Sequence, residues 1–195
     1  MILVTGCSGF IGFNLCLGLL KKGQKIIGID SLNTYYSPKL KKQRLNILKK
    51  NKKFEFHKIN LTQKDKLETI FKEKKFTTIF HLASQPGVTY SFKNPKAYKD
   101  NNIRATLNLA RLSKKFLVKK IIFTSSSSVY GDQVKFPITE KTKLKPKNYY
   151  ATTKISCEKI LKKIYFNKNQ NFLFITRPFT VYGEFGRPDM LFLKI

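Results

Sequence analysis

A tyrosine and a lysine four residues apart form the pair in this chain best suited to acid–base chemistry. Tyr150 and Lys154 stand at positions i and i+4, which places them on one face of a helix. An ammonium group beside a tyrosine hydroxyl favours the phenolate, which can then accept a proton. Tyr149 has Thr153 at the equivalent position and lacks such a partner. The chain contains 9 Tyr and 39 Lys or Arg residues, so this spacing also arises by chance and its meaning depends on its surroundings.

A run of four serines precedes this pair at the end of an expected strand. The strand that we predict over Lys120–Ser125 ends in this run, Ser125-Ser126-Ser127-Ser128. Hydroxyls at the carboxyl end of a parallel strand face the crevice where cofactors bind. There they can hydrogen-bond a sugar hydroxyl or a carbonyl. The alternative is a solvated serine-rich turn.

Three glycines form a loop between the first expected strand and the first expected helix. Gly6 permits a tight turn, and Gly9 lets the backbone approach a pyrophosphate at the helix N-terminus. Gly12 allows the helix to pack closely on the sheet. This spacing is G-x-x-G-x-x-G, and glycine-rich turns also occur for structural reasons alone.

An acidic residue at the end of the second expected strand strengthens this interpretation. Asp30 follows Gly12 by 18 residues, where a carboxylate can bind the ribose hydroxyls of an adenosine. A carboxylate there repels a 2′-phosphate, which favours NAD over NADP. The alternative role for Asp30 is a helix or turn cap.

Short apolar strands alternate with longer helical patterns, which predicts one α/β domain with a mostly parallel sheet covered on both faces. The expected strands are Ile2–Thr5, Lys25–Asp30, Phe54–Ile59, Thr77–Leu82, Lys120–Ser125 and Phe172–Thr176. The expected helices are Phe10–Lys22, Pro38–Lys50, Asp65–Lys74, Pro95–Leu117 and Tyr149–Phe166.

The formal net charge is +28, which raises the question of a nucleic-acid partner. Only 5 of the 39 basic residues are Arg, and the Lys residues are spread along the chain, so a compositional bias explains the charge better. We therefore expect no specific nucleic acid as a partner. No segment resembles a membrane span or a signal peptide, and no metal cluster is expected. Three scattered cysteines, Cys7, Cys16 and Cys157, fit a reducing cytoplasm.

Taken in order, these motifs resemble a known enzyme family. They are Thr5-Gly6-x-x-Gly9-x-x-Gly12, Asp30, His81-Leu82-Ala83, Asn101-Asn102, S-S-S-S-V-Y-G at 125–131, and Tyr150-x-x-x-Lys154. The chain resembles the extended short-chain dehydrogenases/reductases of the NAD-dependent epimerase/dehydratase family, which have a Rossmann-like doubly wound parallel sheet. Segments 35–44, 85–91 and 179–190 are similar to UDP-glucuronate 4-epimerases.

This resemblance implies a role for each catalytic residue. Tyr150 would take the proton from the sugar 4-hydroxyl while hydride passes from C4 to NAD, giving a transient 4-keto intermediate. Lys154 would bind the nicotinamide ribose and tune Tyr150, and Ser126 would assist at the 4-oxygen. Besides Ser126 and Tyr150, the residues implied in binding a UDP-uronic acid are Ser127, Ser128, Thr180 and Arg187.

The resemblance also implies a set of cofactor-binding residues along the cleft. Asn60 stands where the family usually has Asp near the adenine, and it keeps hydrogen-bonding capacity. The full set is Gly6, Ser8, Gly9, Phe10, Ile11, Gly12, Asp30, Asn33, Asn60, Leu61, Leu82, Ala83, Gln85, Asn101 and Lys154.

Related activities remain as alternatives to the epimerase. Sugar 4,6-dehydratases resemble this chain but carry Thr-Asp-Glu where it has Ser126-Ser127-Ser128, so the carboxylates needed for elimination are absent. Decarboxylating relatives share the cofactor site and begin with the same oxidation. An inactive, truncated NAD-binding fragment is a further alternative.

Family members continue past Arg-Pro-Asp-Met into a smaller C-terminal domain that binds the nucleotide sugar. We expect residues 1–177 to form the NAD-binding domain with the catalytic residues, and 178–195 to begin a substrate-binding region that is largely missing. Apolar residues near Phe179–Ile195 would then be exposed. In relatives, the helices expected at Pro95–Leu117 and Tyr149–Phe166 form dimer contacts, which makes a homodimer an expectation here.

Overall fold

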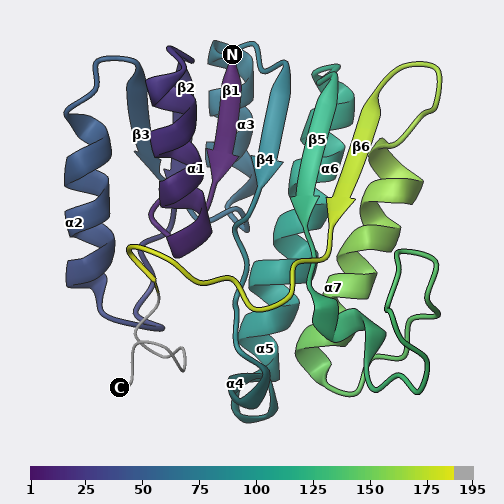
Figure 1. Ribbon diagram of the computed structural model, residues 1–195. Coiled ribbons are helices and arrows are strands. Elements are labelled where there is room, and N and C mark those ends of the chain that lie inside the picture. The colour runs from purple at the N-terminus through teal and green to yellow at the C-terminus, as the bar shows by residue number, and fades with distance from the viewer. Residues whose placement is uncertain (187–195) are drawn as a thin grey trace.

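A six-stranded parallel sheet forms the centre of the protein, which is described over residues 1–186 by a computed structural model (Figure 1). The order β3-β2-β1-β4-β5-β6 confirms the doubly wound arrangement expected from the alternating pattern. β1 lies in the middle of the sheet. After β3 the chain crosses to the other side of β1, so the carboxyl ends of β1 and β4 are neighbours. The strands are β1 (Ile2–Thr5), β2 (Ile26–Asp30), β3 (Phe54–Lys58), β4 (Thr78–His81), β5 (Lys120–Thr124) and β6 (Phe172–Thr176).

Helices cover both faces of this sheet, and each face has its own core. Phe13 and Leu48 belong to the core under α1 and α2, whereas Leu109 and Leu161 belong to the core on the opposite face. In Figure 1, α1 lies in front of the sheet and α3 and α6 lie behind it. The helices are α1 (Phe10–Lys21), α2 (Pro38–Lys49), α3 (Lys64–Glu73), α6 (Ala105–Lys115) and α7 (Tyr149–Ile160).

The region after β4 differs most from the sequence-based expectation. The segment expected as one helix over Pro95–Leu117 begins as α5 (Pro95–Tyr98), widens into a π-helix over Lys99–Arg104 and continues as α6. It ends early because Leu117 has a φ of 52°, outside the helical region. A short helix, α4 (Val88–Lys93), was not predicted, because six residues are too few to show a helical period.

The other long helix also changes its winding. α7 is followed by π-helical turns over Leu161–Tyr165. β5 ends at Thr124 instead of Ser125, and Ser127 and Ser128 lie in a 3₁₀ turn at Ser127–Tyr130. Among the described residues, no helix has the length and apolar character that crossing a membrane requires.

A chain of buried hydrogen bonds links the sheet to the helices behind it. The hydroxyl of Thr106 donates to the Cys157 sulfur at 3.3 Å, so its oxygen accepts from Nε2–H of His81 at 3.0 Å. Nδ1 of His81 then accepts from the hydroxyl of Thr5 at 2.8 Å, and Thr5 accepts the N–H of Ala83 at 3.2 Å. This polarity requires a neutral His81 with its proton on Nε2, and the chain ties β1 and β4 to α6 and α7.

One face of the β5–β6 edge is left uncovered by the described helices. Leu173 and Ile175 of β6 pack against the core shared with α6 and α7. Side chains alternate along a strand, so Phe172 and Phe174 point to the opposite face, where they are 56% and 53% exposed. Of the apolar residues expected to be exposed near Phe179–Ile195, Phe179, Tyr182 and Phe185 are exposed, and those after 186 lie outside the described residues.

The neutral state of His81 predicts a pH dependence of stability. Burial, together with the charge of Lys154, lowers the pKa of His81 from 6.5 to about 3. Below pH 6.5 the unfolded chain therefore binds a proton that the folded protein excludes, and the free energy of unfolding falls by about 2 kcal/mol from pH 7.5 to 5. The substitution His81→Asn removes this contribution. Urea unfolding at both pH values measures it, and an equal pH dependence in variant and wild type would contradict a neutral, buried His81.

The uncovered face of β6 predicts a surface that binds hydrophobic dyes. Replacing Phe172 and Phe174 together by Ser is expected to reduce anilinonaphthalene sulfonate fluorescence at least twofold. Because both rings are exposed, the free energy of unfolding should change by less than about 1 kcal/mol. The control Leu109→Ala, in the buried core, should cost about 2–5 kcal/mol. A loss in the double variant as large as that of the control would show that the face is covered in solution.

Candidate functional site

A cavity of about 300 Å³ runs along the carboxyl ends of the strands. It lies where the strand order switches between β1 and β4, which is the usual place of a crevice in such sheets. Its volume lies within the range typical of cofactor and ligand sites. The structure brings most of the sequence-predicted site residues to its wall. They are Gly6, Gly9, Phe10, Ile11, Gly12, Asp30, Asn33, Asn60, Leu61, Leu82, Ala83, Asn101, Ser126, Tyr150, Lys154 and Thr180.

The glycine loop forms the centre of the wall. Gly6 has a φ of 74°, and a Cβ there would lie 2.8 Å from the backbone nitrogen of Ala83. A Cβ on Gly12 would lie 2.1 Å from the oxygen of Gly6, so only glycine lets α1 start this close to the sheet. Gly9 caps α1 without a side chain, and the first turn of α1 contains no acidic residue. The N-terminus of α1 is therefore suited to an anion supplied from outside the chain.

Asp30 anchors the loop from the end of β2. Its carboxylate accepts the N–H of Leu32 at 2.8 Å and the N–H of Ser8 at 3.1 Å. Burial raises the pKa of the Asp30 carboxyl above its ordinary value, although those N–H groups and the charges of Lys41 and Arg44 act against the rise. The carboxylate thus holds the loop and also lines the cavity.

A buried lysine next to Asp30 was not among the predicted site residues. Lys41, from α2, is 5% exposed and lines the cavity. Its ammonium donates to the backbone oxygen of Asn33 at 2.7 Å and also to the side-chain oxygen of Asn33. Burial lowers the pKa of Lys41, and the charge of Asp30 opposes this. A carboxylate and an ammonium at this end can bind neighbouring hydroxyl groups.

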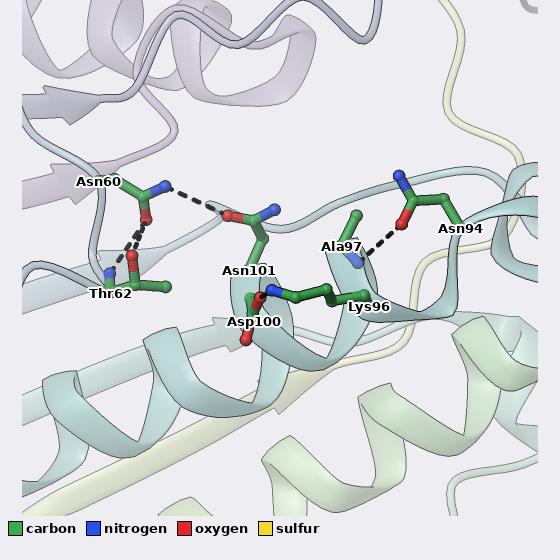
Figure 2. Close-up of polar contacts among 7 residues, drawn as sticks. All are labelled: Asn60, Thr62, Asn94, Lys96, Ala97, Asp100 and Asn101. Carbon is green, nitrogen blue, oxygen red and sulfur yellow. Dashed lines mark hydrogen bonds and ion pairs between the residues drawn. The ribbon is translucent and has the colours of Figure 1, made fainter.

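Two asparagines meet on the wall beside β3. Asn60 donates to the side-chain oxygen of Asn101 at 3.4 Å, and its own oxygen accepts the N–H and the hydroxyl of Thr62 at 3.0 and 2.9 Å. Figure 2 shows this cluster, with Asn101 on the helix that begins at Pro95. The N–H of Ala97 donates to Asn94 and caps this helix, whose π-helical part carries Asn101. π-Helical turns often occur at functional sites.

The residues predicted for catalysis lie together at the other end of the cavity. Tyr150 and Lys154 come from α7, and Ser126 follows β5. The ammonium of Lys154 lies 5.9 Å from the centre of the Tyr150 ring and donates to the backbone oxygen of Thr124 at 2.8 Å. The ring of Tyr98 packs edge-on against Tyr150, with centroids 6.1 Å apart.

Buried contacts fix α7 at this position. The amide of Asn102 donates to the hydroxyl of Thr153 at 3.0 Å, and its oxygen accepts the N–H of Gln85 at 2.7 Å. At the start of α7, Asn148 accepts the N–H of Ala151 at 2.8 Å. Further along, Arg177 pairs with the buried Glu158 through bonds of 2.9 and 2.7 Å. The side chain of Asn102 thus holds both the loop after β4 and the helix that bears Tyr150.

Four of the predicted site residues that the structure describes lie off the cavity wall. Ser8 and Gln85 are buried, and their backbone N–H groups donate to the side chains of Asp30 and Asn102. Ser127 and Ser128 are in the 3₁₀ turn, where the N–H of Ser128 donates to the hydroxyl oxygen of Ser126 at 3.2 Å. Arg187, which was also predicted, lies outside the described residues.

Several wall residues were not predicted from the sequence. Tyr35 and Tyr36 precede α2, Pro86 follows β4, and Pro178 follows β6. Tyr35, Tyr36 and Lys41 lie within segment 35–44, which carries the family resemblance. That resemblance was the one feature of the sequence that could have indicated them. Their part in the wall depends on how the segment folds back over the sheet, and no spacing in the sequence reports that.

Comparison with known proteins agrees with this architecture. The family model described as NAD dependent epimerase/dehydratase family matches residues 2–194. A UDP-glucuronate 4-epimerase of Thermodesulfobacterium geofontis is 43% identical, covering 96% of this chain and 58% of that protein. UDP-glucuronate 4-epimerase 4 of Arabidopsis thaliana is 38% identical, covering 98% of this chain and 44% of that protein.

A solved structure shows the same fold. The UDP-glucuronic acid 4-epimerase of Bacillus cereus, in complex with UDP-glucuronic acid and NAD, superposes with a TM-score of 0.89 at 35% identity. The match covers 98% of this chain and 60% of that one, so the chain spans about 60% of the length of these relatives or less. With the family model matched along nearly its whole length, this chain belongs to the NAD-dependent epimerase/dehydratase family.

Proposed function

We propose that this chain binds NAD and carries the catalytic residues of a nucleotide-sugar 4-epimerase that interconverts UDP-glucuronate and UDP-galacturonate. The observation that carries the proposal is the shared cavity wall. Asp30 and the glycine loop line it after β2 and β1, and Ser126, Tyr150 and Lys154 line it after β5 and on α7. The two relatives and the solved structure compared above act on UDP-glucuronate by name, which supports this substrate class.

The residues of the wall fit NAD. The N-terminus of α1, without a side-chain cap or an acidic residue in its first turn, suits the pyrophosphate. Asp30 and Lys41 would bind the adenosine ribose, and the carboxylate disfavours the 2′-phosphate of NADP. When bound, NAD would supply a hydride acceptor that returns the hydride after the sugar has turned.

The chain's own residues would transfer the proton of the sugar 4-hydroxyl. Tyr150 would accept the proton of the sugar 4-hydroxyl and return it at the end of the reaction. Lys154 would stabilise the phenolate through its nearby charge and donate to the nicotinamide ribose. Ser126 would hydrogen-bond the 4-oxygen. Thr180, on the wall beside them, would contact the sugar, and we keep Arg187 as a further candidate contact.

The side chains after β5 favour epimerisation over elimination. A 4,6-dehydratase needs a carboxylic acid and a carboxylate close to the sugar, whereas Ser126, Ser127 and Ser128 offer only hydroxyls. A decarboxylase of the same family remains the second candidate, because it uses the same oxidation at C4. The products distinguish the two, since decarboxylation yields a pentose.

A homodimer through α6 and α7 and a location in the cytoplasm stay predictions. All three cysteines are free and buried, as a reducing compartment would permit.

Asp30 provides the test of the cofactor site. The substitution Asp30→Asn should weaken NAD binding about 10-fold or more, because hydrogen bonds to a charged group contribute about 1.5–3 kcal/mol. It should also narrow the preference for NAD over NADP, since the repulsive charge is lost. Isothermal titration with both dinucleotides measures this, and Asp132→Asn, on an exposed loop, is the control. An unchanged NAD affinity in Asp30→Asn would contradict the ribose role.

Tyr150 provides the test of the chemistry. Incubating the chain with NAD and UDP-glucuronate should give UDP-galacturonate, measured by chromatography. The substitution Tyr150→Phe should lower this rate about 10²- to 10⁴-fold while NAD affinity changes little. Tyr149→Phe, its neighbour on α7, is the matched control and should stay active. Absence of product with the wild type would show that the chain lacks the proposed activity, and a pentose product would assign decarboxylation instead.

A further inference from the structure

An irregular segment after β6 crosses the carboxyl ends of the strands and reaches the opposite side of the sheet. In Figure 1 it is the yellow trace that runs from β6 past α1 toward α2. Residues 178–181 form part of the cavity wall, and residues 184–186 contact α1 and α2. We call residues 178–186 the crossing segment.

The far end of this segment is docked through its backbone. The guanidinium of Arg44, from α2, donates to the oxygens of Phe185 and Gly186 at 2.8 and 3.0 Å. The amide of Asn14, from α1, donates to the oxygen of Glu184 at 3.1 Å. The Phe185 ring packs edge-on against Phe13, with centroids 4.8 Å apart, and Phe185 has a φ of 60°. A non-glycine residue keeps such a conformation only where its surroundings hold it.

The same guanidinium also contacts the cofactor loop. Its other terminal nitrogen donates to the backbone oxygen of Ser8 at 3.2 Å and to the hydroxyl of Tyr36 at 2.8 Å. Arg44 is 2% exposed, and its charge acts on the nearby Asp30 carboxylate. One buried side chain therefore joins the glycine loop, the segment before α2 and the crossing segment.

A guanidinium is suited to this arrangement. It offers five N–H groups in a rigid planar fork, so it can donate to several acceptors on different segments at once. A lysine has one nitrogen at the end of a flexible stem and cannot reproduce this geometry. Arg44 does not line the cavity itself, so its effect on a bound cofactor must pass through the segments it holds.

We propose that Arg44 is a positioning residue that fixes the crossing segment against the glycine loop and thereby retains the cofactor. The proposal rests on NAD binding in the cavity, as proposed above. With the segment docked, residues 178–181 form one wall of the site, and NAD can leave only slowly. Without Arg44, the segment loses two of its backbone contacts, and the wall opens. Loss of Arg44 therefore raises the dissociation rate of NAD more than it changes the association rate.

The test compares Arg44→Met with Lys42→Met, which removes the same charge from an exposed position on the same helix. The dissociation rate of etheno-NAD, displaced by excess NAD in stopped flow, should rise at least 10-fold in Arg44→Met and stay unchanged in Lys42→Met. The association rate should change less than 3-fold. Arg44→Lys should recover only part of the slow dissociation, because one ammonium cannot bridge the three segments. Unchanged dissociation in Arg44→Met would overturn the proposal.

A second readout needs no cofactor. Cleavage by the Glu-specific protease after Glu184, followed by mass spectrometry, reports undocking of the crossing segment in the NAD-free protein. It should be at least 10-fold faster in Arg44→Met than in Lys42→Met. If NAD fails to bind the wild type, the proposed function fails, yet this cleavage still tests the docking role of Arg44. Equal cleavage in the two variants would overturn that role.

Asn14→Ala guards against a variant that simply unfolds. It removes a contact to the crossing segment and leaves every bond of Arg44 in place. It should speed both NAD dissociation and cleavage after Glu184, by a smaller factor than Arg44→Met. If Arg44→Met does not fold and Asn14→Ala changes neither rate, retention of the cofactor by the crossing segment is refuted.

Discussion

The close approach of the glycine loop to the loop after β4 is the constraint on which the whole site depends. A Cβ on Gly6 would meet the backbone of Ala83, and a Cβ on Gly12 would meet Gly6. With both absent, α1 begins directly above the carboxyl ends of β1 and β4, and Thr5 can accept the N–H of Ala83. The helix terminus that suits a pyrophosphate and the loop that leads toward Tyr150 therefore become walls of one continuous cavity.

Buried polar side chains transmit this arrangement to the catalytic helix. Asn102 bonds both to Gln85, in the loop after β4, and to Thr153, between Tyr150 and Lys154. The His81 chain reaches the same helix at Cys157 through a second route. Because an unsatisfied buried polar group is costly, these networks tolerate few alternative positions of α7. Tyr150 is thus located by hydrogen bonds that lie behind the cavity rather than in it.

The sequence was sufficient for the parts of the site that depend on local pattern. Glycine spacing, Asp30 at a strand end and the Tyr150–Lys154 spacing are local, and the structure places all of these residues on one wall. The doubly wound sheet followed from the alternation of strands and helices. What could not be predicted depends on contacts between distant segments. Arg44 and Phe185 are 141 residues apart, and neither carries a pattern that names the other. The π-helical widening at Asn101 departs from the 3.6-residue period on which helix prediction rests.

Surface lysines and buried arginines have different roles in this chain. The chain has a net charge of +28, and most of this comes from lysines that lie on the surface. Arg44 and Arg177, by contrast, each donate to acceptors on more than one segment: Arg44 to Ser8 and Phe185, Arg177 to Glu158 and the backbone oxygen of Glu140. A composition that favours lysine can change surface positions freely, since an exposed ammonium needs only solvent. A buried guanidinium that joins three segments cannot be replaced in this way, because a lysine there would leave carbonyl oxygens without donors. The two arginines therefore mark where this fold needs a planar donor.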